Sequence, residues 1–323
     1  MNSQAGKDCI LVTGATGFIG SSLVNKLVPE HQVKAVVRKD LSMPNVDVVS
    51  EDLNPATNWS KYLGNVSSII HLAARVHIMH DTAVDPLSEF RKVNVEGTLN
   101  LARQAAKAQV RRFIFLSSIK VNGEETRQNE PFKETDEPAP KDSYAISKWE
   151  AEEGLFRIAD ASGMEVVVIR PPLVYGPGVK ANFLQMMKWL YRGIPLPLGA
   201  IDNKRSLVAL DNLIDLIKVC IHHPAAANQV FLVSDGEDLS TTELLRRLAR
   251  AMGRWPKLVP IPSKILKVGL GMFGKADIAK RICGSLQVDI RKARKVLGWQ
   301  PPVSVDEGLE QTATWFLHSW GKG

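Results

Sequence analysis

Short apolar runs alternate with longer amphipathic stretches from the beginning of the chain. Runs without polar interruption, such as Phe113–Leu116 and Val166–Ile169, are typical of parallel strands that are buried on both faces. The stretches between them carry apolar residues three and four positions apart, which is typical of helices that pack against a sheet. This alternation predicts β-α-β units and therefore an α/β fold built on a doubly wound parallel sheet.

The elements follow one another in a regular order until a pair of prolines. The predicted strands are Cys9–Val12, Val33–Val37, Val46–Val49, Ser68–Leu72, Arg112–Ser117, Glu165–Ile169 and Gln229–Val233, and the helices between them include Ile19–Val28, Glu89–Ala108 and Tyr144–Ala161. Pro171 and Pro172 end the alternation, because prolines interrupt regular structure. We expect a first domain over residues 1–172, rejoined by 205–235, and a smaller C-terminal α/β region over 173–323.

Composition places the chain among ordinary globular proteins, with 45% hydrophobic and 23% charged residues. The N-terminus lacks a basic start followed by an apolar segment, and no apolar run approaches the ~20 residues that span a bilayer. Cys9, Cys220 and Cys283 lie far apart without metal-ligand spacing. We therefore expect a cytoplasmic protein with unpaired thiols and no metal site.

The net charge of +7 restricts the partners less than the distribution of the charges does. Basic residues are scattered, and no recognition helix or basic-aromatic repeat of the kind found in nucleic-acid binders is present. We interpret the charge as a generally basic surface, with attraction of an anionic nucleotide diphosphate as the alternative.

One segment, Pro262–Ile282, alternates lysines with apolar residues. A helix that lies on a membrane surface is one interpretation of that pattern. Three glycines interrupt it, so we expect a folded lid or packing helix and no membrane contact. The lysines are Lys264, Lys267, Lys275 and Lys280, and the glycines are Gly269, Gly271 and Gly274.

A glycine motif joins the first predicted strand to the first helix. Gly14 permits a tight turn, Gly17 allows the backbone to approach a pyrophosphate, and Gly20 allows close packing of helix on strand. The phosphates would lie at the helix N-terminus, where free N–H groups and the helix dipole favour negative charge. The motif predicts a dinucleotide site that also includes Thr16, Phe18 and Ile19.

The end of the second strand predicts which dinucleotide is bound. Chains that bind NAD usually carry an acidic residue there, which accepts a hydrogen bond from the ribose 2′-hydroxyl. Here Arg38 and Lys39 come first, and an arginine would bind a 2′-phosphate with two hydrogen bonds. We therefore expect NADP. The alternative is NAD, with Asp40 bound to the ribose and Arg38 exposed to solvent.

Tyr144 and Lys148 are four positions apart, which places both side chains on one helix face. The ammonium can then favour the phenolate of a tyrosine whose ordinary pKa is ~10. A dinucleotide site followed by an activated phenol predicts transfer of a hydride and a proton at one carbinol carbon.

The ordered motifs resemble the extended short-chain dehydrogenase/reductase family, in its NAD-dependent epimerase/dehydratase branch, and the resemblance covers nearly the whole chain. Ser117–Gly123 resembles the family's Ser-Ser-Ser-x-x-Val-Tyr-Gly, although Lys120 and Asn122 replace a small residue and the tyrosine. The resemblance implies a Rossmann fold in which Ser118 bonds the reacting oxygen and Tyr144 exchanges the proton. By the same resemblance, Lys148 binds the nicotinamide ribose.

Further contacts follow from the same resemblance. For the cofactor it implies Asp52 and Leu53 at the adenine, and Leu72, Ala73, Ala74 and Pro171 along the dinucleotide. For a UDP-sugar diphosphate it implies Asn182, Arg205 and Arg281. We interpret His71 as a packed strand residue and Asn94 as a brace between adjoining strands.

The first function that the resemblance implies, together with Arg38, is reduction of a UDP-4-keto-hexosamine with NADPH. Such an enzyme would act in surface-polysaccharide (O-antigen) biosynthesis, as a reductase of the UDP-N-acetylquinovosamine type. The first alternative is a UDP-glucose or UDP-N-acetylglucosamine 4-epimerase with bound NAD. An epimerase regenerates its cofactor and gains nothing from NADP, so Arg38 favours the reductase.

Two other interpretations are weaker. A ketone reductase acting on a non-sugar substrate is the second alternative. A non-catalytic nucleotide-binding protein on the same fold is disfavoured, because Ser118, Tyr144 and Lys148 are all present. The resemblance also implies a homodimer.

Overall fold

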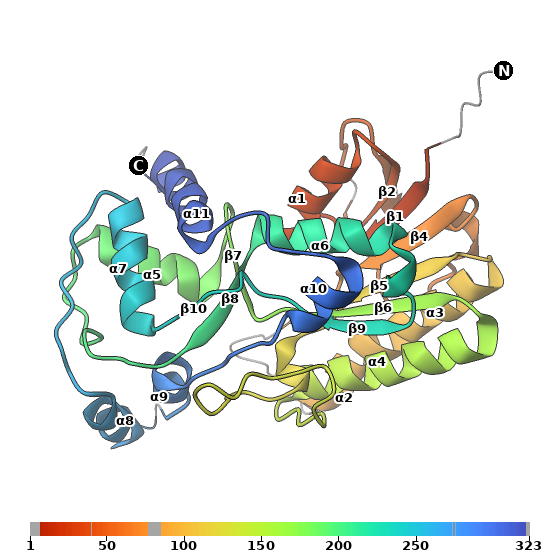
Figure 1. The fold of residues 1–323 in the computed structure, drawn as a ribbon. Helices are drawn as coiled ribbons and strands as arrows, with labels where there is room; N and C mark the ends of the chain where they lie inside the picture. Colours follow the sequence, from red (N-terminus) through yellow and green to blue (C-terminus); the bar gives the residue numbers. More distant parts are fainter. Residues whose placement is uncertain (1–6, 40, 77–84, 273, 275, 321–323) are drawn as a thin grey trace. The chain divides into compact units, whose positions relative to one another are not determined.

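A computed structural model describes residues 7–39, 41–76, 85–272, 274 and 276–320 (Figure 1). The chain divides into two compact units. The first unit comprises Met1–Gly123, Glu137–Arg170 and Ile217–Phe231, and the second comprises Glu124–Asp136, Pro171–Leu216 and Leu232–Gly323.

A seven-stranded sheet forms the centre of the first unit. Its strands are β1 (Cys9–Thr13), β2 (Gln32–Val37), β3 (Asp47–Ser50), β4 (Val66–His71), β5 (Arg112–Leu116), β6 (Glu165–Arg170) and β9 (Gln229–Leu232), in the order β3-β2-β1-β4-β5-β6-β9. The pairs from β3 to β6 are parallel. This arrangement confirms the predicted doubly wound sheet. The strand order reverses at β1 and β4, which is where such sheets bind ligands.

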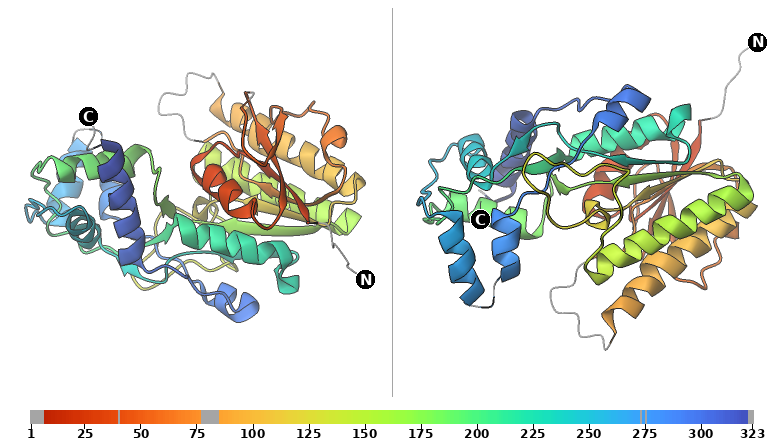
Figure 2. Two further views of the ribbon diagram at one scale, coloured as in Figure 1. Left: turned by 90° about the horizontal axis from the view of Figure 1, so that it is seen from above. Right: turned by 60° about the horizontal axis from the view of Figure 1, so that its bottom comes forward.

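Helices cover both faces of this sheet (Figure 1). The face that carries α3 (Thr98–Lys107) and α4 (Ser143–Ser162) has these two helices side by side (Figure 2). The other face carries α1 (Phe18–Leu27) and the C-terminal half of α6 (Leu210–His222). Short 3₁₀ turns lie at Ser60–Tyr62, Ile119–Val121 and Pro224–Ala226.

Continuous apolar strands fill the core between the sheet and α3 and α4. Ile69 and Phe113 lie against Leu101 and Leu155, and all four side chains are fully buried. Because both faces of the strands are covered, the uninterrupted apolar runs in the sequence find partners on each side.

The described residues of the second unit form a small sheet and six helices in addition to the N-terminal half of α6. Its strands β7 (Leu173–Tyr175), β8 (Arg205–Ala209) and β10 (Asp238–Leu239) lie in the order β10-β8-β7. Its helices are α5 (Ala181–Tyr191), α7 (Thr241–Ala251), α8 (Ser263–Met272), α9 (Ala276–Cys283), α10 (Arg291–Leu297) and α11 (Val305–Trp320).

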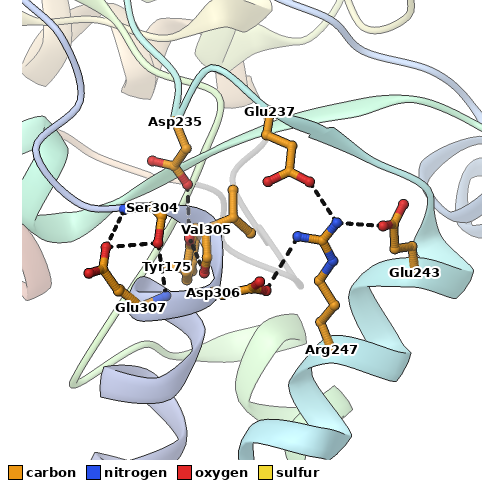
Figure 3. A network of polar contacts seen from close by, with 9 residues as sticks. All are labelled: Tyr175, Asp235, Glu237, Glu243, Arg247, Ser304, Val305, Asp306 and Glu307. Carbon is orange, nitrogen blue, oxygen red and sulfur yellow. Dashed lines mark hydrogen bonds and ion pairs between the residues drawn. The ribbon is translucent and has the colours of Figure 1, made fainter.

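A polar network closes the second unit (Figure 3). The Tyr175 hydroxyl donates to Asp235 Oδ2 at 2.8 Å, and burial raises the pKa of both groups. Arg247 on α7 pairs with Glu237 and Glu243, each at 2.6 Å, and with Asp306 on α11 at 3.3 Å. The network therefore ties α7 and α11 to the ends of the small sheet.

The described part of the chain contains neither a membrane-spanning helix nor a metal-binding cluster. None of its helices is long and apolar enough to cross a membrane. Its histidine, cysteine and carboxylate side chains also form no group of three that could hold a metal ion.

Replacing Gly20 by alanine tests the close packing of α1 on β1. A Cβ at Gly20 would lie 2.1 Å from the carbonyl oxygen of Gly14, so backbone would have to move. We expect Gly20→Ala to lower the free energy of unfolding by about 3 kcal/mol, as in overpacked cores, measured by urea denaturation. Gly64→Ala is the control, because its Cβ would meet no atom within 4 Å. An equal effect of both substitutions would contradict the packing argument.

Candidate active site

The turn between β1 and α1 forms an open cradle for an anion. Gly14 has a φ of +69°, and a Cβ there would lie 2.8 Å from the backbone nitrogen of Ala73. Gly17 is exposed at the N-cap of α1, and no described side chain caps this helix. The first N–H groups of α1 are therefore left for an outside acceptor. Together with the exposed Thr16, these features fit the pyrophosphate of a dinucleotide.

A buried histidine fixes the neighbouring strand end. His71 Nδ1 lies 2.8 Å from Thr13 Oγ1, and Nε2 lies 2.9 Å from Thr98 Oγ1. Burial lowers the pKa of His71 to about 3, so the imidazole is neutral at ordinary pH. Thr13 also accepts from the Ala73 N–H at 3.1 Å. His71 is thus a packed residue that positions the segment Leu72–Ala74 against the glycine turn.

The residues expected at the adenosine end lie on two strand ends. Arg38 is exposed directly after β2, and it forms no ion pair with any described residue. Asp52 is exposed after β3, while Leu53 is buried. Asp40, the alternative ribose partner, lies outside the described residues.

Lys148 lies buried between α4 and the sheet. Its ammonium is 3.8 Å from the centroid of the Phe115 ring on β5, a cation–π contact. Phe115 in turn stacks on His71 with ring centroids 5.8 Å apart. Burial lowers the pKa of Lys148 to about 7, although Glu152 opposes this effect. This row of contacts connects the helix that carries Tyr144 and Lys148 to the glycine turn.

The phenol of Tyr144 is a weaker acid than its spacing from Lys148 predicts. Its ring packs edge-on against Phe90, with centroids 6.3 Å apart. Burial, followed by the charge of Asp142, raises the pKa of Tyr144 to about 12. Lys148 does not offset this, because its ammonium lies over the Phe115 ring and its own pKa is near neutrality. The sequence-based expectation of an activated phenol is therefore not met by the chain alone.

Ser118 lies beside the first turn of α4. It caps the 3₁₀ turn Ile119–Val121, where its Oγ accepts from the Lys120 N–H at 3.2 Å. Lys120 Nζ pairs at 2.5 Å with Oδ2 of Asp142, and Asp142 is the N-cap of α4. This ion pair holds the Ser118 turn against the helix end that carries Tyr144.

A buried ion pair beneath these residues was not predicted. Arg170 Nη2 lies 2.5 Å from Glu152 Oε2, with the two side chains 3% and 0% exposed. Ser117 donates its hydroxyl proton to Glu152, and Arg170 donates to Asn122 Oδ1 at 2.9 Å. Asn122 therefore has an internal partner, which gives its departure from the family pattern a structural reason. One feature of the sequence could have indicated this ion pair: Glu152 lies four positions after Lys148, on the same helix face.

The predicted helix Glu89–Ala108 is interrupted, so that prediction is partly wrong. The structure has α2 (Pro86–Arg91), a π-helical turn at Lys92–Gly97, and then α3. In the wider turn, Asn94 Oδ1 accepts from the Arg75 N–H at 2.7 Å, and Nδ2 donates to Ser147 Oγ at 3.0 Å. Asn94 thus braces a loop and α4 rather than two adjoining strands. Such π-helical turns often accompany functional sites.

The other predicted contact residues belong to the second unit. Pro171 is buried, whereas Asn182 on α5 and Arg281 on α9 are exposed. Arg205 donates to the Gly284 carbonyl oxygen at 3.0 Å, and burial lowers the pKa of this arginine. Tyr175, the last residue of β7, is fully buried and donates its hydroxyl proton to Asp235. The glycine turn, Ser118, Tyr144 and Lys148 all belong to the first unit.

Comparison with known families identifies the class of the chain. The model of the NAD dependent epimerase/dehydratase family matches residues 10–234. The chain belongs to this family. The matched span includes the glycine turn, Ser118, Tyr144 and Lys148, so the resemblance stated from the motifs is confirmed.

Several relatives in this family cover almost the entire chain. A UDP-glucose 4-epimerase of Vibrio cholerae is 49% identical over 314 residues, which are 96% of each chain. The crystal structure of UDP-glucose 4-epimerase with UDP-glucose from Thermotoga maritima is 25% identical, with a TM-score of 0.77 over 96% of this chain and 99% of that one. MoeE5 in complex with UDP-glucuronic acid and NAD is 26% identical, with a TM-score of 0.78 over the same shares.

Substitutions in the buried ion pair test its role under the site. Arg170→Met leaves the Glu152 carboxylate buried without its partner, so we expect a loss of about 3–5 kcal/mol in the free energy of unfolding. The double variant Glu152→Leu/Arg170→Met buries no charge and should be more stable than Arg170→Met. The exposed pair of Arg91 and Glu150 is the control, since Glu150→Leu should cost less than about 1 kcal/mol. A double variant less stable than Arg170→Met would contradict this account.

Proposed function

We propose that the protein is a UDP-sugar 4-epimerase that works with bound NAD. The relative that is 49% identical across 96% of both chains, a UDP-glucose 4-epimerase, is the observation that supports this most strongly. The first unit adds an uncapped helix terminus at a glycine turn, together with Ser118, Tyr144 and Lys148 on adjoining elements.

In this proposal each unit binds a different molecule. The first unit binds the dinucleotide through the turn Gly14–Gly20 and the segment Leu72–Ala74. The second unit binds the UDP-sugar, with Asn182, Arg205 and Arg281 assigned to the diphosphate. Arg205 uses one nitrogen on Gly284, and its remaining N–H groups are donors that suit a phosphate.

The proposed chemistry is removal and return of hydrogen at C4 of the hexose. When bound, NAD supplies the acceptor and later the donor of the hydride. Tyr144 takes the proton of the C4 hydroxyl and afterwards returns it to the same oxygen. The Ser118 hydroxyl donates a hydrogen bond to that oxygen, and Lys148 donates to the nicotinamide ribose. Because the oxygen regains its proton and the carbon its hydride, no net redox change occurs.

A reductase that consumes NADPH is the second candidate, and the sequence ranks it first. The exposed Arg38 at the end of β2 favours it, because a guanidinium suits a 2′-phosphate. The relatives favour the epimerase, since the Vibrio cholerae protein carries that activity in its name and MoeE5 is in complex with NAD. Surface-polysaccharide biosynthesis and the homodimer stay predictions.

Cofactor release and product analysis distinguish the two candidates. We expect the purified protein to release NAD on denaturation, and to interconvert UDP-glucose and UDP-galactose without added cofactor. The corresponding N-acetylhexosamine pair serves as the second substrate test. Release of NADP, with NADPH oxidation only in the presence of a UDP-4-keto sugar, would establish the reductase instead.

Tyr144→Phe tests the proton-transfer assignment. Loss of the phenol removes the group that exchanges the proton, so kcat should fall by about 10²–10⁴-fold while cofactor binding persists. Tyr191→Phe is the matched control, because that ring packs on Phe316 in the second unit. Turnover of Tyr144→Phe near the wild-type rate would show that another group moves the proton.

A further inference from the structure

Basic residues occur throughout the chain, but the excess of positive over negative charge is concentrated in one segment. Residues 254–281 contain seven lysines and arginines and one aspartate, a net charge of +6. The other residues carry 34 basic and 33 acidic side chains, so the segment accounts for nearly all of the net charge of +7. This segment belongs to the second unit and includes α8 and most of α9.

Helix α8 presents an apolar stripe to solvent. Ile265, Val268 and Met272 recur at helical spacing on one side of the helix, and they are 61%, 64% and 82% exposed. No residue of α8 is buried. Leu266 and Leu270, on another side, are half-buried next to α9, the neighbouring helix. The helix therefore packs with one side only and leaves an apolar side uncovered.

Two lysines flank this stripe. Lys264 and Lys267 are exposed, and neither forms an ion pair with any described residue. A Cβ at Gly271 would meet no atom within 4 Å, so the end of the helix is open to solvent as well. The stripe and the lysines together define what we call the α8 surface: Lys264, Ile265, Lys267, Val268 and Met272.

We propose that the α8 surface docks the second unit on an anionic lipid membrane. Lys264 and Lys267 would lie at the lipid phosphates, and the three apolar side chains would enter the headgroup boundary. Amphipathic helices with a basic border bind membrane surfaces in this way, through apolar burial together with attraction to anionic lipid. The inference revises the expectation of a fully packed helix without membrane contact, and it is independent of the reaction catalysed.

The same features argue against two other occupants. Two copies of the α8 surface would place like charges opposite one another, which opposes association. Three side chains also fall far short of the ~800 Å² per partner that a stable protein interface buries. A nucleic acid would use the lysines, but its phosphate backbone gains nothing from an exposed apolar stripe.

Cosedimentation of the full chain with vesicles tests the proposal. We expect binding to vesicles of phosphatidylglycerol mixed with phosphatidylcholine, weak binding to phosphatidylcholine alone, and release at high salt. Lys264→Glu/Lys267→Glu should lower the partition coefficient at least about 25-fold, since each lysine near an anionic surface strengthens membrane binding about fivefold. Arg103→Glu/Lys107→Glu on α3 changes the net charge equally and should bind nearly as wild type does. Equal loss in both double variants, or no binding by wild type, would overturn the proposal.

A fluorophore on Met272→Cys reports whether the stripe itself enters the lipid. The native thiols Cys9, Cys220 and Cys283 are buried, so the label attaches at the new site. Its emission should shift to the blue on addition of anionic vesicles, whereas the same label on Lys107→Cys should not respond. A blue shift that needs no lipid and grows with protein concentration would show self-association instead and reject the membrane assignment.

Discussion

The buried ion pair of Glu152 and Arg170 is the interaction on which the candidate site depends. Arg170 ends β6, Ser117 follows β5, and Glu152 lies on α4, so a single carboxylate joins two strand ends to one helix. The fully buried carboxylate needs all of its partners, because an unpaired charge at that depth would be strongly destabilising. The register of α4 against the sheet is thereby fixed, and with it the positions of Ser118, Tyr144 and Lys148.

The burial of Lys148 and the partial burial of Tyr144 also disfavour the charged forms of these two side chains. A phenol with a pKa of about 12 lies about five units from neutrality, equivalent to about 7 kcal/mol. Burial also lowers the pKa of Lys148 toward neutrality, with its ammonium over the Phe115 ring, so Lys148 favours the phenolate less than an exposed lysine would. A positive charge brought by a bound partner would lower the pKa of Tyr144, and a cationic nicotinamide is such a charge. In the proposed reaction, a bound cationic nicotinamide would therefore favour the phenolate of Tyr144.

Local and periodic features could be predicted from the sequence, whereas long-range contacts could not. The seven strands of the large sheet and the glycine turn could be predicted, because apolar runs and glycine spacing can be recognised in consecutive residues. The partners Ser117, Glu152 and Arg170 are far apart in sequence, and only the fold brings them together. The position of the Lys148 ammonium over Phe115 depends on how closely α4 packs against the sheet. The spacing of residues in the sequence does not determine that distance. The exposed Arg38 predicts NADP, whereas the similar protein MoeE5 is in complex with NAD.

The titration of Tyr144 with and without dinucleotide tests the central claim most directly. With ¹³Cζ-tyrosine, the four tyrosines give separate NMR signals, and Tyr144→Phe identifies the one of interest. In protein stripped of cofactor, the Tyr144 signal should not titrate below pH 10. Addition of NAD should lower its midpoint by at least about two units, as expected for an opposite charge nearby. A midpoint near neutrality without cofactor, or one that NAD does not move, would contradict the account.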